Sequence, residues 1–408
     1  MRSANEQRPL VARGRVLPID DPPLRDGLVL VAAGRLAYVG PANRAPRRTK
    51  GAEEVDVGDG TVLPGLIDAH VHLTCDGGPR FMEEVHGVPP EDLALKAATN
   101  AARSLARGIV AVRDLGAPGK AAIAVGHAVK ARGLAGCEVA AAGRALTAPG
   151  GHIPFLGVEV AGPDHVAAVA RQQLEAGAAG IKLVVTGGIL TEGVPLADAA
   201  YDEEELAAAS RVAREAGAWV AAHAIGAEGT KRALRAGATT IEHGVFLDDE
   251  ALELMRSNGA ILVPTIIPLA KIIEHGRAGG IPEDAVAKAE SVVDNHVDSF
   301  QRAARAGVPI AAGTDAGTPF NPHGNLAEEA RLLIDRAELS HELALRAATR
   351  VAARCLGRDD LGHLSEGAPG HLVVVDGDPS DDIAALARVR SVVHGGRMAT
   401  PSITLRAL

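Results

Sequence analysis

The sequence of 408 residues predicts an α/β protein built mainly from a (β/α)8 barrel, and three observations support this. Eight short apolar runs alternate with alanine-rich segments of helical length between residues 63 and 356. That length suits eight strands and eight helices, which typically need about 250 residues. No GxGxxG turn follows an early strand, which argues against a doubly wound sheet.

The apolar runs are the expected barrel strands. Helices are expected between them at 90–107, 163–176, 202–216, 248–257 and 281–306. In chain order the runs read LPGLIDAHVH, GIVAVRDLG, CEVAAAGR, GIKLVVTGG, AWVAAHAIG, ATTIEHGV, AILVPT and VPIAAGTDAG.

Both ends of the chain differ from this middle part. Residues 1–62 and 357–408 contain short β-type runs separated by glycine, proline and charged turns, without a helical period. The economical packing is one small β-sandwich formed by the two terminal segments. It would lie beside a catalytic barrel of residues 63–356.

Composition limits the classes of function. A net charge of -9 argues against nucleic acid or an anionic membrane as a partner, because both require a concentrated basic face. Cys75, Cys137 and Cys355 are too far apart for a CxxC site, and they fit a reducing compartment. No apolar run reaches the roughly 18 residues of a membrane span, and the N-terminus lacks the apolar core of a signal peptide. We therefore expect a cytoplasmic homo-oligomer that acts on a small molecule.

Polar side chains stand at the ends of several predicted strands. The C-terminal ends of barrel strands form the face on which barrel enzymes build active sites. Residues two apart on a strand share a face, as two imidazoles must to bind one metal. The side chains gathered at this rim are His70, His72, Lys182, His223, His243 and Asp315.

This order of residues resembles the amidohydrolase superfamily of metal-dependent hydrolases. The phrases PGLIDAHVHL, VRDLG, GIKLVVTGG, VAAHAIG, TTIEHGV and AAGTDAG resemble its imidazolonepropionase-related branch. That branch includes metal-dependent dipeptidases and carboxypeptidases of the prolidase type. GRLAYVG and LVVVDGDP extend the resemblance to nearly the whole chain, although Gly370 and His371 stand where many relatives have Ala-Asp.

The resemblance implies a centre with two divalent metals, for which Zn is expected and Mn, Co or Fe are alternatives. It assigns the buried metal to His70, His72 and Asp315, the outer metal to His223 and His243, and a bridge between them to Lys182 carboxylated by CO2. An ammonium has no lone pair for a metal, whereas a carbamate supplies two anionic oxygens.

The resemblance also implies a mechanism in which a hydroxide that bridges the metals attacks the substrate carbonyl. Asp315 would take a proton and pass it to the leaving nitrogen. His152 is the candidate donor to the substrate carbonyl, and His323 is a second candidate for substrate contact. Asp68 and Asp114 are candidates for supporting the metal ligands from behind.

The expected reaction is hydrolysis of an amide bond in a dipeptide or an N-acyl amino acid, as in an Xaa-Pro dipeptidase or carboxypeptidase. A mononuclear ring-opening hydrolase of a cyclic amide or imidazolone is an alternative, as is a lactone or ester hydrolase. Lys182 favours the first reaction, because a mononuclear site needs no bridge. An inactive relative used for assembly is disfavoured by retention of all six rim residues. Specificity is expected to depend on loops such as 74–89 and 268–282.

Overall fold

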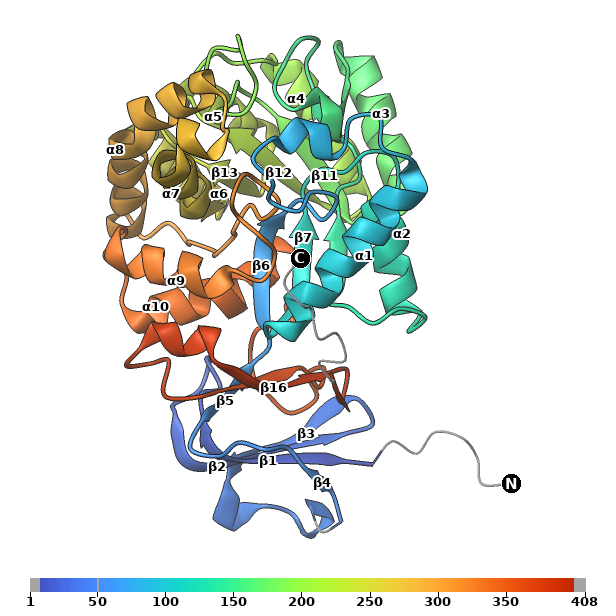
Figure 1. The fold of residues 1–408 in the computed structure, drawn as a ribbon, viewed down its shortest axis with the longest axis vertical. Coiled ribbons are helices and arrows are strands. Elements are labelled where there is room, and N and C mark those ends of the chain that lie inside the picture. The colour runs from blue at the N-terminus through green and yellow to red at the C-terminus, as the bar shows by residue number, and fades with distance from the viewer. Residues whose placement is uncertain (1–7, 50, 400–408) are drawn as a thin grey trace.

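The computed structural model describes residues 8–49 and 51–399, which form a barrel and a separate β-sheet (Figure 1). The barrel occupies the upper part of the view and is surrounded by helices. The first strands of the chain, in blue, and the last ones, in red, lie side by side below it. None of the helices in the described ranges has both the length and the apolar character needed to cross a membrane.

Seven of the eight predicted barrel runs form parallel strands, and all of these except β8 are almost completely buried. Strands buried on both faces are typical of a sheet whose outer side is covered by helices. In chain order the strands are β6 (Leu66–Val71), β7 (Ile109–Asp114), β8 (Glu138–Ala141), β11 (Gly180–Val184), β12 (Trp219–Ala224), β13 (Thr240–His243) and β14 (Ile261–Val263).

The eighth run, residues 308–317, completes the circle through isolated β-bridges instead of a regular ladder. Leu262 N donates to Pro309 O at 2.9 Å, and Ala69 N donates to Ala312 O at 3.0 Å. The chain passes very close to its neighbours here, because a Cβ on Gly313 would lie 2.5 Å from Val263 Cγ1. On the other side of the circle, Ala179 N donates to Ala141 O at 2.8 Å and joins β8 to β11.

The helices match the predicted ones to within two residues at each end. Asp202 and Glu205 form a reciprocal capping box at the start of the fourth helix, and Asp248 caps the sixth. The barrel helices are α1 (Pro90–Ala106), α2 (Ala121–Lys130), α3 (Pro163–Glu175), α4 (Glu203–Glu215), α5 (Ala227–Ala236), α6 (Asp249–Asn258), α7 (Ile266–His275), α8 (Glu283–Arg305), α9 (Leu326–Asp335), α10 (His341–Arg346) and α11 (Ala352–Cys355).

Helix α7 corrects the expectation that residues 268–282 form a loop. Ile266, Ile267, Leu269 and Ile272 give the segment a buried apolar face, and Glu329 accepts hydrogen bonds from its first backbone N–H groups. Two short strands, β9 (Ala145–Thr147) and β10 (Gly157–Glu159), were not expected either. They lengthen the sheet beside β11.

The terminal segments share one eight-stranded sheet, as the predicted sandwich requires. The sheet bends back on itself, because Gly370 N donates to Gly34 O at 2.8 Å, and it encloses its own apolar cluster. Residues 1–7 and 400–408 of these segments lie outside the described residues, and the exact domain boundaries stay a prediction. The strands are β1 (Leu10–Val16), β2 (Leu24–Ala32), β3 (Arg35–Pro41), β4 (Glu53–Glu54), β5 (Thr61–Pro64), β15 (Leu372–Val375), β16 (Val389–His394) and β17 (Arg397–Met398).

A polar cluster joins this sheet to the barrel at the N-terminal end of β8. His371 Nε2 lies 3.2 Å from Glu138 Oε1, and Arg358 Nη1 donates to Glu138 Oε2 at 2.7 Å. The His394 ring lies beside that of His371, tilted by 35°, with 4.6 Å between the ring centroids. His371 Nδ1 accepts a hydrogen bond from Gly395 N, so the ring proton is on Nε2 and is donated to Glu138. This arrangement is a hydrogen-bonded link and leaves no lone pair on His371 for a metal.

Candidate active site

All six predicted rim residues line one cavity at the C-terminal ends of the barrel strands. The cavity opens to solvent, the space in and above it is about 640 Å³, and most of the side chains that line it are buried. His70 lies on β6 and His72 just beyond it, Lys182 lies on β11, and Asp315 follows the eighth segment. The remaining two rim residues are His223 on β12 and His243 on β13.

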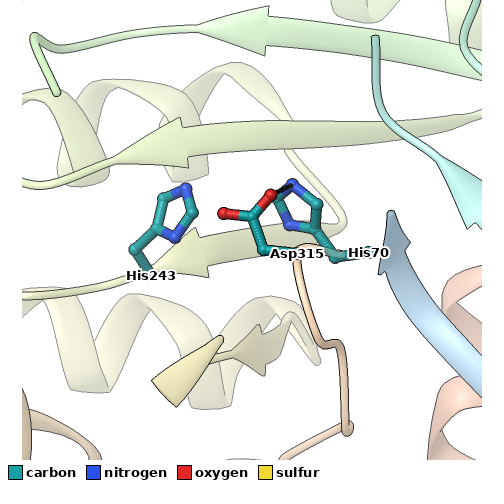
Figure 2. Close-up of side chains that lie close together, drawn as sticks. All are labelled: His70, His243 and Asp315. Atoms are coloured by element: carbon teal, nitrogen blue, oxygen red, sulfur yellow. Dashed lines mark ion pairs between the residues drawn. The ribbon is translucent and has the colours of Figure 1, made fainter. Parts of the chain in front are cut away.

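The carboxylate of Asp315 lies between the histidines of different strands (Figure 2). Its Oδ1 is 3.4 Å from His70 Nε2 and 3.3 Å from His72 Nε2. His243 contributes a third group, and one ligand atom each from His70, His243 and Asp315 lies within 4.8 Å of the others. Asp315 Oδ1 is buried and has no hydrogen-bond partner.

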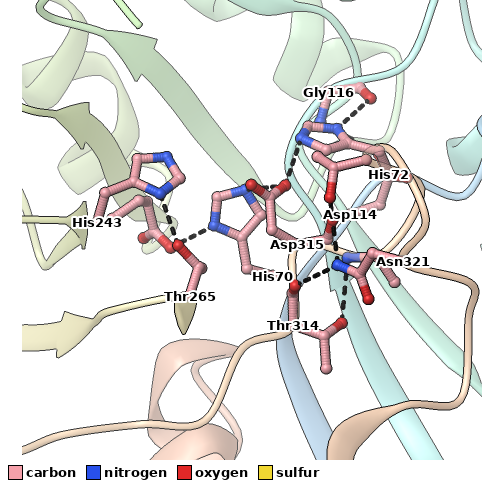
Figure 3. Close-up of polar contacts among 12 residues, drawn as sticks. His70, His72, Asp114, Gly116, His243, Thr265, Thr314, Asp315 and Asn321 are labelled. Carbon is pink, nitrogen blue, oxygen red and sulfur yellow. Dashed lines mark hydrogen bonds and ion pairs between the residues drawn. The ribbon is translucent and has the colours of Figure 1, made fainter. Parts of the chain in front are cut away.

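Hydrogen bonds behind the rings fix which nitrogen of each histidine carries the proton (Figure 3). His70 Nδ1 lies 2.9 Å from Glu242 Oε2, and His72 Nδ1 lies 3.0 Å from Gly116 O. Both partners are acceptors, so each neutral ring has its proton on Nδ1 and a lone pair on Nε2. Two lone pairs and one carboxylate oxygen therefore face one another, which is the arrangement of a cation site.

In each of the other two histidines, one hydrogen bond likewise fixes which nitrogen carries the proton. His223 Nε2 donates to Gly187 O at 2.8 Å, which leaves a lone pair on Nδ1. His243 Nδ1 lies 2.6 Å from Thr265 Oγ1, whose own proton goes to Pro264 O, so this ring has its lone pair on Nε2. The ring centroids of His223 and His243 are 4.6 Å apart.

Burial keeps these rings neutral. It lowers the pKa of His70 to about 4 and that of His223 to about 3, and it lowers the pKa of His243 well below its ordinary value. The cause is that a protonated ring loses its hydration in the barrel interior. Neutral imidazoles with converging lone pairs are the form that binds divalent metals.

Lys182 is buried among these groups. No hydrogen bond or ion pair in the described part of the chain involves its Nζ, although the charges of Glu242 and Asp315 act on it. Burial lowers the pKa of Lys182 to about 8, so roughly a tenth of the side chain is an uncharged amine at pH 7, far more than for an exposed lysine.

Glu242 and Arg113 form a buried ion pair behind the site that sequence reasoning missed. Arg113 Nη2 donates to Glu242 Oε1 at 2.9 Å, and both side chains are completely buried. Burial alone would raise the pKa of Glu242, but the Arg113 charge and the hydrogen bond from His70 lower it to about 2. The sequence did contain a signal for this pair, namely a charged residue inside each of two apolar runs, Arg113 in VAVRD and Glu242 in TTIEH.

Asp68 and Asp114 support the backbone of the site and do not touch the imidazole rings. Asp68 accepts hydrogen bonds from Thr314 N at 2.9 Å and Thr314 Oγ1 at 2.6 Å, which ties β6 to the segment that carries Asp315. Asp114 accepts from Leu73 N at 2.8 Å and holds the loop after β6. Burial raises the pKa of Asp68 to about 7 and that of Asp114 to about 6.

His152 lies in the cavity, whereas His323 does not. The His152 ring is 4.7 Å from that of His223, and its Nδ1 is 2.7 Å from Thr191 Oγ1. Its place depends on Gly188, where a Cβ would lie 2.3 Å from His152 Nε2. His323 Nε2 lies 2.9 Å from Cys75 O, so this residue holds the loop after β6 from outside the cavity wall.

The backbone of the site is strained. Nine described non-glycine residues have positive φ, and four of them line this cavity, namely Ile153, His243, Thr265 and Asp315. Such conformations cost of order 1–3 kcal/mol each and collect at functional sites. His296 Nε2 lies 3.1 Å from His243 O and holds one of these strained positions.

Comparisons with known proteins agree with this geometry. Residues 61–399 match the model described as the Amidohydrolase family. The chain is 27% identical to the ochratoxinase of Aspergillus niger, covering 95% of this chain and 86% of that protein. It is also 27% identical to the imidazolonepropionase of Aromatoleum aromaticum, with 84% of each chain covered. A crystal structure of an Xaa-Pro dipeptidase with bound methionine superposes with a TM-score of 0.88 at 32% identity, covering 96% of this chain and 99% of that one.

Proposed function

Since the chain belongs to the amidohydrolase family, with prolidase-like and imidazolonepropionase relatives, and is a hydrolase, we propose that it uses two divalent metals to cleave an amide bond of a small molecule. The observation that carries this proposal is the group of acceptors around Asp315. His70 Nε2, His72 Nε2 and Asp315 Oδ1 face one another without a proton between them. Buried acceptors in such contact require a cation.

The proposed ligands are the six rim residues, with Lys182 as a carbamate. An uncharged amine is the form that adds CO2, and the lowered pKa of Lys182 favours it. A carbamate would also remove the buried positive charge from a site intended for cations. The proposed metals, Zn in the first instance, would lower the pKa of a water and polarise the substrate carbonyl when bound.

The residues of this chain have separate proposed roles in the reaction. Asp315 would take a proton on its carboxylate and return it to the leaving nitrogen. His152 would orient the substrate carbonyl. Glu242, fixed by Arg113, holds the proton of His70 on Nδ1 and so keeps its Nε2 available as a ligand.

The proposed substrate is the amide of a small molecule, such as a dipeptide or an N-acyl amino acid. An ochratoxinase and an Xaa-Pro dipeptidase are among the relatives with high coverage, and these names support an amide over a cyclic imidazolone. The buried Lys182 also favours the amide reaction, because only a binuclear site needs a bridging carbamate. Ring opening of a cyclic amide, and lactone or ester hydrolysis, remain the alternatives.

Elemental analysis together with an amide assay tests this proposal. Protein produced with Zn or Mn should hold two metals per chain and hydrolyse members of a library of dipeptides, N-acyl amino acids, lactones and imidazolones, with amides turned over fastest. Lys182→Ala should lose most metal affinity, and short carboxylic acids should restore part of it. Full activity with one metal per chain, or much faster turnover of lactones or imidazolones than of every amide, would contradict the proposal.

A further inference from the structure

Beyond the proposed ligands, the active-site cavity has two apolar walls. Phe81 and Ile153, in the loops after β6 and β9, belong to one apolar cluster. The other wall belongs to a second cluster, which α7 and the loops after β12 and β13 supply. Its cavity-lining members are Ile225, Val245, Leu269 and Ile272. A partly buried Ile189, in the loop after β11, packs against the second cluster and also lines the cavity.

The polar side chains that remain in the lining already have partners within the protein. Thr318 Oγ1 donates to Asp315 O at 2.7 Å, Thr265 Oγ1 donates to Pro264 O, and His296 Nε2 contacts His243 O. Apart from the six proposed metal ligands, only His152 is free to contact a substrate, because its Nε2 has no hydrogen bond among the described residues. The two apolar walls therefore offer almost no hydrogen-bond partner to a charged group of a substrate.

The cavity also lacks a cation for a substrate carboxylate. In the described part of the chain, Lys182 is the only lysine or arginine that lines it. Lys182 lies among the proposed metal ligands, close to Glu242 and Asp315, and does not belong to either apolar wall. Lys288, which lies close enough to act on His152, donates to Thr191 O at 2.7 Å and is paired with Asp284 at 2.7 Å.

We propose that the substrate carries apolar, uncharged groups on both sides of the scissile amide and that a free carboxylate on either side is rejected. This inference rests on the proposed function and narrows its substrate class to amides with blocked ends, so that the free dipeptides and N-acyl amino acids named there become poor substrates. A carboxylate moved from water to an apolar wall loses its hydration and gains no partner. Amides with blocked ends should therefore be better substrates than free dipeptides and N-acyl amino acids.

Two pairs of size-matched amides test each side of the scissile bond. For the amine side, the hexanoyl amide of 4-aminobenzoate is compared with that of 4-aminoacetophenone, which replaces the carboxylate by an acetyl group. For the acyl side, the monoanilide of adipic acid is compared with the anilide of 6-oxoheptanoic acid. With metal-loaded protein, kcat/KM for the uncharged member should exceed that for the carboxylate by about 100-fold or more in each pair.

A cation placed on the wall should reverse this preference in part. Ile189 lies in a loop and is only partly buried, so Ile189→Arg should be tolerated. We expect it to lower the ratio within at least one pair by about tenfold, because the carboxylate gains a charge-assisted partner. Ile189→Gln places a shorter side chain that is polar but uncharged at the same position and is the control, for which the ratio should stay near that of the wild type.

The outcomes separate this inference from the proposed function. Cleavage of the carboxylate member as fast as the uncharged one would overturn the inference and leave amide hydrolysis intact. If neither member of a pair is cleaved while free dipeptides or N-acyl amino acids are, the inference is overturned and the proposed function stands. If no amide is cleaved at all, the proposed function fails, and binding of each pair to the metal-loaded protein, measured by calorimetry, decides the inference. Tighter binding of the uncharged members would support it, and equal or tighter binding of the carboxylates would overturn it.

Discussion

At the scale of single residues, the site depends on where each histidine keeps its proton. Four rings donate one N–H to a fixed acceptor, which leaves the other nitrogen of each as a lone pair. Asp315 has no such partner on Oδ1, and its positive φ of 54° turns the side chain toward the rings. Its small neighbours in GTDAG leave room for a water and substrate.

Asp315→Asn tests the proposed proton transfer. Asn keeps the shape and one coordinating oxygen but is not a base, so near-normal metal content is expected with kcat/KM lower by at least about a hundredfold. Metal analysis and steady-state kinetics on the same sample measure both. Loss of metal together with activity would leave Asp315 only a ligand role, and retention of most of kcat/KM would remove it from the mechanism.

At the scale of secondary-structure elements, helix α7 connects the core of the barrel to His243, a proposed metal ligand. Glu329 on α9 is completely buried, and its carboxyl accepts from Ile266 N at 2.9 Å and from Ile267 N at 3.1 Å. Thr265, which fixes the proton of His243, immediately precedes these two residues. Burial raises the pKa of Glu329 to about 8, so it is mostly a neutral acid at pH 7.

Glu329→Ala should therefore weaken the positioning of His243, although Glu329 does not contact it. The first N–H groups of α7 would lose a buried acceptor, at a cost of about 1–3 kcal/mol in the free energy of unfolding, and metal should dissociate faster. Glu329→Gln keeps an acceptor and should stay near the wild type. Glu328→Ala, on the same helix but partly exposed, is the control, and equal metal release from Glu328→Ala and Glu329→Ala would contradict this role.

At the scale of the whole molecule, the proposed active site and the link to the terminal sheet lie at opposite ends of the barrel strands. The proposed metal ligands lie near the C-terminal ends, whereas Glu138 begins β8 and contacts His371 and Arg358. Burial alone would raise the pKa of Glu138, but the hydrogen bond from His371 and the charge of Arg358 lower it to about 2. The link should therefore affect stability without affecting the chemistry.

Glu138→Gln should lower the free energy of unfolding by about 1–2 kcal/mol at pH 7 and leave kcat/KM unchanged. Because the pKa of Glu138 is lower in the folded protein than in the unfolded chain, its contribution is complete above about pH 4.5 and is lost as the pH falls toward 2. Urea unfolding at pH 7 and pH 3 measures this. Glu366→Gln, an exposed control, should show no such difference, and a pH-independent effect of Glu138→Gln would contradict the prediction.

The sequence by itself determined the barrel and the six residues of its rim. Apolar runs and capping residues such as Asp202 are local signals, and a barrel brings the ends of its strands to one face, so His70 and Asp315 could be placed together without a structure. The terminal sheet could be predicted for the same reason, because both ends of the chain have short β-type runs.

Only the tertiary structure decided how that rim is supported and what its cavity accepts. Which acceptor meets His70 Nδ1 depends on side chains from other strands, so Glu242 and Arg113 were missed. Asp68 and Asp114 were expected to support the proposed ligands from behind, and the structure shows that they do so through backbone N–H groups. His323 was expected to face the substrate because its loop follows the last strand, but that loop folds back onto Cys75. Periodicity reports which residues are buried and not which partners they meet, because those contacts join residues far apart in the chain.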